Sequence, residues 1–272
     1  MAFSINSILL KKVVISLLLV ILGSGVFAQV DSVRLNGKYI KHYWTDSRDL
    51  IVSPLKWDKK DLLRFGIYAG TTTAFFFADE PVRDFFQNHR TQGMDHVTHD
   101  FFSPLGGTWS VFISAGYYGL GLARHNGRMQ STGLMAVESY LVGSVIARIP
   151  KIVFGRVRPD AWDHPSAFRW EGPFGGSSFP SGHTAAAFSV AAVFATQYRQ
   201  IKWVPVLSYS LAAAVGLSRI YENRHWTSDV FTGAIIGLIT GKFICKSFRN
   251  EDFSVAPCFD GPVKGLTFVY HL

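Results

Sequence analysis

Six apolar segments between residues 62 and 243 most strongly constrain the fold of this chain. They cover residues 62–78, 105–123, 131–149, 184–198, 203–217 and 228–243. Small residues recur inside them, as in Thr184-Ala185-Ala186-Ala187, and small residues let helices approach each other closely in a bilayer. We therefore expect an all-α fold, a closely packed transmembrane bundle of about six helices.

The composition also favours a membrane protein, because 48% of the residues are hydrophobic and only 17% are charged. The formal net charge of +8 comes from Lys and Arg scattered through the loops. This distribution disfavours nucleic-acid binding and suits anionic lipids or phosphorylated substrates. A soluble helical bundle remains the alternative, since two segments have only about 15 residues where a membrane span needs roughly 20, and Arg64, Glu138 and Arg148 lie within other segments.

Residues 1–28 have the pattern of a secretory signal peptide. Lys11 and Lys12 precede an apolar run over residues 13–22, and small residues lead to Ala28. An uncleaved signal anchor is the alternative. We divide the remaining chain into an N-terminal extension (29–61), a helical domain (62–247) and a C-terminal tail (248–272), in which alternating apolar residues predict a short strand.

Two basic residues follow the third apolar segment. Lys151 and Arg158 are seven residues apart, nearly two helical turns, so we expect both on one face of a helix that continues to Pro159. Two cations on one face form part of a clamp for an oxyanion, and Arg can bind phosphate oxygens with two parallel hydrogen bonds. Basic residues at a membrane helix end are, alternatively, interfacial anchors.

A Gly- and Ser-rich loop over residues 172–178 leads into Ser181-Gly182-His183 and the fourth apolar segment. Ser181 is predicted to cap a helix, and Gly182 lets a ligand approach the first free N–H groups. A helix N-terminus of this kind binds anions. We expect His183 to give or take a proton there, although a His that merely faces solvent is the alternative.

The last group of polar residues is Arg219, His225 and Asp229. His225 and Asp229 are four residues apart and would share one face of a helix. The carboxylate could then hold one imidazole nitrogen and leave the other free as a nucleophile. A structural His–Asp pair is the alternative.

The topology brings the three groups together. The 34 residues from 184 to 217 form one antiparallel helix pair that returns to its starting side. The third helix ends, the fourth begins and the fifth ends at that side. We therefore expect all three groups at one end of the bundle, around a space suited to a phosphoryl group.

The complete pattern resembles the three-part signature of the type 2 phosphatidic acid phosphatase superfamily. Its parts are Lys151-x6-Arg158-Pro159, Pro180-Ser181-Gly182-His183 and Ser218-Arg219-x5-His225-x3-Asp229. The resemblance covers about residues 62 to 245, and no signature position is missing. It implies a helical, metal-independent phosphohydrolase with no cofactor.

The resemblance also implies a division of roles. His225 attacks phosphorus to form a phosphohistidine, Asp229 orients His225, and His183 protonates the leaving oxygen and later activates water. The oxygens of the phosphoryl group would be held by Lys151, Arg158, Arg219, Ser181 and the Gly182 backbone. Arg156 lies next to this set and is not assigned to it.

Two further clusters of polar residues are weaker candidates for functional sites. Asp95, His96, His99 and Asp100 have metal-ligand-like spacing, but a polar loop is the preferred interpretation. The second group begins directly after the apolar residues 75–77 and consists of Asp79, Glu80, Arg83 and Asp84. A solvated helix end is preferred there over contact with substrate headgroups.

The leading functional hypothesis is a membrane phosphatase that hydrolyses a lipid phosphate or diphosphate. Substrate candidates are phosphatidic acid, undecaprenyl diphosphate, phosphatidylglycerophosphate and a lipid A phosphate. The alternatives are a soluble secreted acid phosphatase, a vanadium-dependent haloperoxidase and a non-enzymatic membrane protein. Expected partners are a lipid phosphate and the membrane, with no nucleic acid and no obligate protein partner.

The expected location is the bacterial cell envelope, with the active site facing the periplasm. Basic residues collect on the side opposite the three motifs and place that side in the cytoplasm by the positive-inside rule. They are Arg124, Arg128, Arg199, Lys202, Lys242 and Lys246. A cleaved signal followed by six crossings would instead put the motifs inside, so these two expectations conflict.

Overall fold

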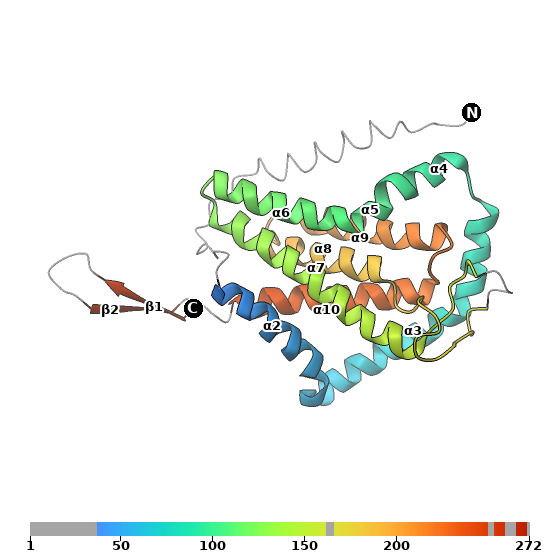
Figure 1. Cartoon of the computed structure of the whole chain (residues 1–272), viewed down its shortest axis with the longest axis horizontal. Coiled ribbons are helices and arrows are strands. Elements are labelled where there is room, and N and C mark those ends of the chain that lie inside the picture. The colour runs from blue at the N-terminus through green and yellow to red at the C-terminus, as the bar shows by residue number, and fades with distance from the viewer. Residues whose placement is uncertain (1–36, 162–165, 250–252, 259–264, 271–272) are drawn as a thin grey trace.

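The computed structural model describes residues 37–161, 166–249, 253–258 and 265–270. The predicted signal peptide at 1–28 lies outside these residues. The elements in chain order are α2 (Gly37–Val52), the 3-10 turn η1 (Ser53–Lys56), α3 (Lys59–Asn88), α4 (Gln92–Val97), the π-helical turn η2 (Thr98–Phe102), α5 (Ser103–Leu105), α6 (Thr108–Ala123), α7 (Gly127–Phe154), α8 (Gly182–Gln197), α9 (Trp203–Tyr221), α10 (Thr227–Arg249), β1 (Phe253–Cys258) and β2 (Gly265–Tyr270) (Figure 1).

Each of the six apolar segments corresponds to one long helix, α3, α6, α7, α8, α9 or α10, although residues 105–107 of the second segment precede α6 and Tyr198 of the fourth follows α8. The predicted helical bundle is therefore confirmed. Helix α7 ends, α8 begins, α9 ends and α10 begins at the same end of the bundle (Figure 1). This agrees with the predicted antiparallel helix pair that returns to its starting side. Helix α2 was not predicted, and its Leu50 joins Met135, Val142 and Ile244 in the core.

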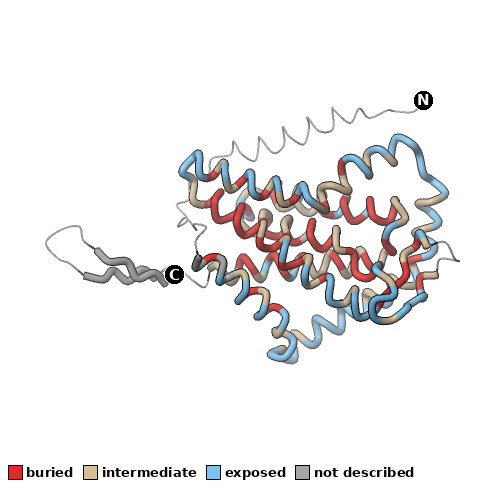
Figure 2. The backbone as a smooth tube through the Cα atoms, in the orientation of Figure 1, coloured by how far each residue is buried: buried red, intermediate tan, exposed pale blue. Residues whose placement is uncertain are grey.

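Helix α8 lies in the middle of the bundle, where the buried residues gather (Figure 2). Its small side chains let α10 pass very close. A Cβ at Gly237 would lie 2.3 Å from the carbonyl oxygen of Ala185, and one at Gly241 would lie 2.3 Å from that of Ser189. Only glycine at these α10 positions permits this backbone approach, which confirms the predicted close helix packing.

Three of the described helices, α7, α9 and α10, are long and apolar enough to cross a membrane. Helix α3 adds a run of exposed apolar side chains, which include Leu62, Leu63, Phe65 and Ile67. Exposed apolar surface of this extent is typical of a face that contacts lipid or another apolar partner.

The two strands lie beyond α10 and pair antiparallel, with Phe253 opposite Tyr270 and Cys258 opposite Gly265. The predicted terminal strand corresponds to β2. Its partner β1 was not predicted. The bundle itself is all-α, and the hairpin follows it in the chain.

Candidate active site

The first motif leaves its helix earlier than expected. Helix α7 ends at Phe154, and Gly155 closes it with a left-handed backbone (φ 58°). A Cβ at Gly155 would lie 1.7 Å from the carbonyl oxygen of Gly172, so only glycine fits. The prediction that α7 continues through Arg158 to Pro159 is therefore wrong, because the chain turns at Gly155 and Arg156 then forms an isolated bridge with Trp170.

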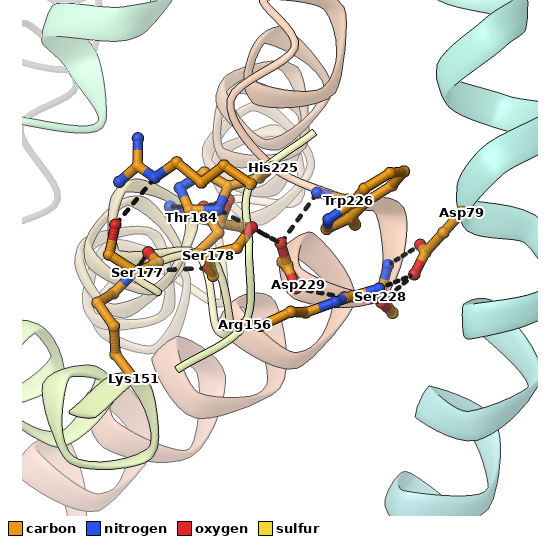
Figure 3. A network of polar contacts seen from close by, with 12 residues as sticks. Asp79, Lys151, Arg156, Ser177, Ser178, Thr184, His225, Trp226, Ser228 and Asp229 are labelled. Carbon is orange, nitrogen blue, oxygen red and sulfur yellow. Dashed lines mark hydrogen bonds and ion pairs between the residues drawn. The ribbon is translucent and has the colours of Figure 1, made fainter. Parts of the chain in front are cut away.

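Lys151 and Arg158 nevertheless converge on one residue of the Gly- and Ser-rich loop. The Nζ of Lys151 donates to the carbonyl oxygen of Ser177, and the Nε of Arg158 donates to the Ser177 hydroxyl at 3.1 Å. Ser177 thus binds both cations from a loop that follows α7. Figure 3 shows Ser177 next to Lys151. The two residues meet as predicted, but through a loop rather than along a helix face.

The second motif begins α8 as predicted. The Ser181 side chain accepts from the Thr184 backbone N–H, and the Ser181 N–H donates to the carbonyl oxygen of Asp229 at 3.0 Å. A Cβ at Gly182 would meet no atom within 4 Å, so the space beside the first N–H groups of α8 is open. His183 follows at the rim of this space, and its Nε2 would lie 3.6 Å from a Cβ at Gly107.

The third motif spans the turn between α9 and α10. Arg219 is buried at the end of α9, and its Nη2 donates to Glu222 at 2.7 Å. Helix α10 begins at Thr227, so His225 lies before it and the prediction that His225 and Asp229 share one helix is wrong. The turn still brings Nδ1 of His225 to 3.5 Å from Oδ2 of Asp229.

Asp229 is fully buried and held on both oxygens. Its Oδ2 accepts from the Ser178 hydroxyl at 2.5 Å and from the Trp226 N–H at 2.9 Å. Its Oδ1 accepts from Nη1 of Arg156 at 2.6 Å. The carboxylate plane is therefore fixed, with one edge toward His225.

Arg156 and Asp79 form a buried ion pair that sequence reasoning missed. Nη2 of Arg156 donates to Oδ2 of Asp79 at 2.6 Å, and both side chains are completely buried. Asp79 also accepts from the N–H and the hydroxyl of Ser228, at 2.8 and 2.6 Å. The interpretation of Asp79 as part of a solvated helix end is wrong, because α3 packs this residue against the start of α10. The local signal was an Asp placed directly after an apolar run, where a buried charge needs a partner.

Burial and neighbouring charges lower the pKa values of His225 and His183. Burial lowers the pKa of His225 to about 4, and this effect outweighs the opposite pull of Asp229. Burial also lowers the pKa of His183 to about 4, helped by the charges of Arg219, His225, Arg158 and Lys151. The charges of Arg219, Arg158 and Lys151 all act on His183, so residues of all three motifs lie close together. Both imidazoles are neutral at pH 7 and able to accept a proton.

An open polar cleft of about 520 Å³ lies beside Arg219. Its lining combines residues of α4 and η2 with Arg90, with Asp160 after the first motif and with three residues inside the third motif. The α4 and η2 residues are Asp95, His96, Thr98 and His99, and those of the third motif are Glu222, Asn223 and Arg224. The predicted polar loop at 95–100 is wrong, because these residues lie on α4 and η2. Asp95 accepts from Arg90 at 2.7 Å, and no group of three or more described His, Cys, Asp or Glu side chains is arranged to hold a metal.

Comparisons with known proteins agree with the motifs. Residues 132–252 match the PAP2 superfamily. The chain is 37% identical over 123 residues to the lipid A 1-phosphatase of Porphyromonas gingivalis, a match that covers 43% of this chain and 25% of that protein. It is 28% identical over 181 residues to phosphatidylglycerophosphatase B of Bacillus subtilis, with 62% of this chain and 79% of that protein covered.

The solved structure of a transmembrane PAP2 type phosphatidylglycerolphosphate phosphatase from Bacillus subtilis shares 24% identity with the chain. The match has a TM-score of 0.49 and covers 70% of this chain and 94% of that one. The chain spans only about a quarter of the Porphyromonas protein. All three motifs lie inside residues 132–252, which match the PAP2 superfamily, the superfamily that the signature resembles.

Proposed function

We propose that this protein is a metal-independent phosphatase that hydrolyses a lipid phosphate or diphosphate through a phosphohistidine on His225. The observation that carries the proposal is the 3.5 Å approach of Nδ1 of His225 to Asp229, inside a buried site surrounded by cations. With Nδ1 facing a carboxylate, Nε2 is the nitrogen left to attack. Relatives named as lipid A 1-phosphatase and phosphatidylglycerophosphatase support a phosphorylated lipid as substrate.

The phosphoryl group would sit in the open space beside Gly182. The free N–H groups at the start of α8 and the Ser181 hydroxyl would bind one side of it. Lys151, Arg158 and Arg219 would neutralise the remaining oxygens. Phosphoryl transfer depends mainly on positioning and charge neutralisation, and three cations supply the positive charge for which other phosphatases use a metal ion.

The reaction would proceed in two displacements. Nε2 of His225 forms a bond to phosphorus while the bond to the leaving oxygen breaks, and His183 gives a proton to that oxygen. His183 then takes a proton from a water molecule, whose oxygen attacks phosphorus and releases His225 and inorganic phosphate. The bound phosphate is negative and offsets the surrounding cations, so it raises the pKa of His183 and lets it act as the acid.

The polar cleft beside Arg219 would receive the part of the substrate next to the phosphate. Glu222 lines the cleft and also accepts a hydrogen bond from Arg219. A headgroup in the cleft would therefore lie next to the residues that bind the phosphate. The mixed charges of the cleft suit a headgroup with both donors and acceptors.

The site would face the periplasm of a bacterial envelope. Helix α7 runs from Gly127 to its end near Lys151, so the basic residues at the α6–α7 turn lie at the opposite end of the bundle from the motifs. Arg128 packs over Tyr198 there, which adds the α8–α9 turn to the same basic end. Cationic ends of this kind remain in the cytoplasm.

The test is phosphate release by the purified protein in detergent micelles. The panel contains lipid A 1-phosphate, phosphatidylglycerophosphate, undecaprenyl diphosphate, phosphatidic acid and a soluble phosphomonoester. We expect at least one lipid to be hydrolysed far faster than the soluble ester, and His225→Asn to abolish release while the exposed-turn variant His125→Asn does not. Equal rates on all substrates would favour a non-specific acid phosphatase, and vanadate-dependent halide oxidation would replace the proposal with haloperoxidase activity.

A further inference from the structure

We infer that Asp79 and Arg156 are positioning residues for the reaction at His225, acting through Asp229 from outside the phosphate site. This inference rests on the proposed function, because it concerns the same His225–Asp229 pair. The three charged side chains form one continuous chain from α3 to α10: Asp79, Arg156 and Asp229 (Figure 3).

Arg156 has no donor left for a phosphate. Its five N–H groups match its five hydrogen bonds, which go to Asp79, Asp229, Ser228 and twice to the carbonyl oxygen of Ala167. The guanidinium is also enclosed by the rings of Phe76, Trp170 and Trp226, at 4.5, 5.3 and 5.4 Å from their centroids. Arg156 therefore binds groups of the protein and not the phosphate, unlike the roles proposed for Arg158 and Arg219.

The charges within this group explain why two carboxylates are present. Arg156 alone would neutralise Asp229 and leave little negative field at His225. Asp79 adds a second carboxylate to the same guanidinium, so the group carries a net charge of −1 when both carboxylates are ionised. Burial raises the pKa of Asp79, and its hydrogen bonds from Arg156 and Ser228 oppose that rise. When Nε2 of His225 bonds to phosphorus, its ring becomes positive, and a negative group held at a fixed distance stabilises that state.

Asp79 also fixes the position of Asp229 through the backbone. It accepts from both the N–H and the hydroxyl of Ser228, the residue directly before Asp229 in the first turn of α10. Asp79 belongs to α3, whereas Arg156 follows α7. The pair thus ties two other helices to the turn that carries the His225–Asp229 contact.

A purely structural ion pair is the competing explanation, and kinetics separate the two. A buried pair is weak evidence for stability, because apolar replacements are often as stable. A structural role predicts a lower melting temperature with unchanged kcat in the folded protein. A positioning role predicts a lower kcat with little change in KM, because only the transition state needs the negative field.

The experiment compares Asp79→Asn with Asp84→Asn in full-length protein on the preferred lipid substrate. Both residues lie on α3, but Asp84 is an exposed partner of Arg83 and lies outside the buried group. We expect Asp79→Asn to lower kcat by about 10- to 100-fold, which is typical when a group that orients a reactive residue is removed. Its KM should stay within about twofold of the parent value. Asp84→Asn should keep the parent kcat and KM.

The double variant Asp79→Asn/Arg156→Met keeps the test informative if Asp79→Asn folds poorly. It removes one charge of each sign, so it leaves no unpaired buried cation and keeps the net charge of the group at −1. We expect its kcat to be lowered as well, because Asp229 loses the Arg156 donor and Ser228 loses its Asp79 acceptor. A folded Asp79→Asn protein with parent kcat would overturn the inference, as would a rise in KM alone. Loss of the proposed function itself would appear separately, as full activity in His225→Asn.

Discussion

Oδ2 of Asp229 faces Nδ1 of His225 at 3.5 Å and also accepts the hydroxyl of Ser178 at 2.5 Å. One carboxylate oxygen thus links the Gly- and Ser-rich loop to the turn before α10. Ser178 is fully buried, although sequence reasoning assigned it no role. The position of the loop and the orientation of Asp229 therefore depend on each other.

Replacing Ser178 with Ala should lower kcat about tenfold, since Asp229 then loses one of the donors that fix it. Hydrogen bonds to charged groups contribute about 1.5–3 kcal/mol, so unfolding should also become easier by a comparable amount. Steady-state kinetics and thermal unfolding measure the two effects. Ser144→Ala is the matched control, because its hydroxyl only bonds within α7 to Tyr140. Unchanged kcat in Ser178→Ala would contradict the role of this contact.

The low pKa of His225 predicts an unusual acid limb. Burial brings this pKa to about 4, below the usual value of 6.5, so the ring stays neutral and nucleophilic at pH 6. The value of kcat/KM, corrected for ionisation of the substrate, should fall only as the pH drops toward 4. A limb centred near pH 6.5 would show that the imidazole is not shielded from water.

The same pKa shift predicts how stability depends on pH. The unfolded chain binds a proton at His225 below pH 6.5, whereas the folded protein does so only near pH 4. Its contribution to stability is therefore fully present above pH 6.5 and is lost as the pH falls from 6.5 to 4. Thermal unfolding at pH 7 and pH 5 should give a lower melting temperature at pH 5, and this difference should shrink in His225→Asn.

Gly182→Ala should separate folding from phosphate binding. A Cβ at this position meets no protein atom within 4 Å, and Ala favours a helix start more than Gly does, so the protein should fold normally. The methyl group would instead occupy space proposed for phosphate, and kcat/KM should fall by about tenfold or more, a loss of about 1.4 kcal/mol. Gly70→Ala on α3 also meets open space and should leave kcat/KM unchanged. Normal activity in Gly182→Ala would move the phosphate elsewhere.

Gly237→Ala tests the packing of the bundle instead of the site. Its Cβ would lie 2.3 Å from the carbonyl oxygen of Ala185, so α10 must move away from α8. Overpacking of this kind costs about 1–3 kcal/mol. The melting temperature in detergent should fall, while Gly116→Ala, where a Cβ meets open space, should not change it. An unaffected melting temperature in Gly237→Ala would mean that the helices are not tightly apposed.

Local patterns predicted the helices and the motif residues, because both depend on residues close in sequence. The apolar runs gave the six long helices, and Ser181 predicted the start of α8. The helix ends were less predictable: the spacing of Lys151 and Arg158 suggested a continuous helix, while Gly155 between them was the true stop signal. The interval from His225 to Asp229 likewise suggested one helix, where the protein uses a turn.

Long-range pairing could not be predicted from the sequence. Asp79 and Arg156 are 77 residues apart, and although Asp79 directly follows an apolar run, nothing near either residue in the chain identifies its partner. The packing of α3 against the start of α10 buries Asp79, and Arg156 is enclosed there by the rings of Phe76, Trp170 and Trp226. Helix α2 was missed for a related reason, since it joins the core through a few residues such as Leu50 and lacks a long apolar run.

The central claim is that His225 becomes covalently phosphorylated, and rapid quenching tests it most directly. The protein is mixed with a ³²P-labelled lipid phosphate, quenched in alkali, which preserves phosphohistidine, and mapped by mass spectrometry. We predict label on His225 in the parent protein, more label in His183→Gln with a substrate whose leaving group needs no proton, and none in His225→Asn. Label on another residue, or turnover without any labelled protein, would contradict the account.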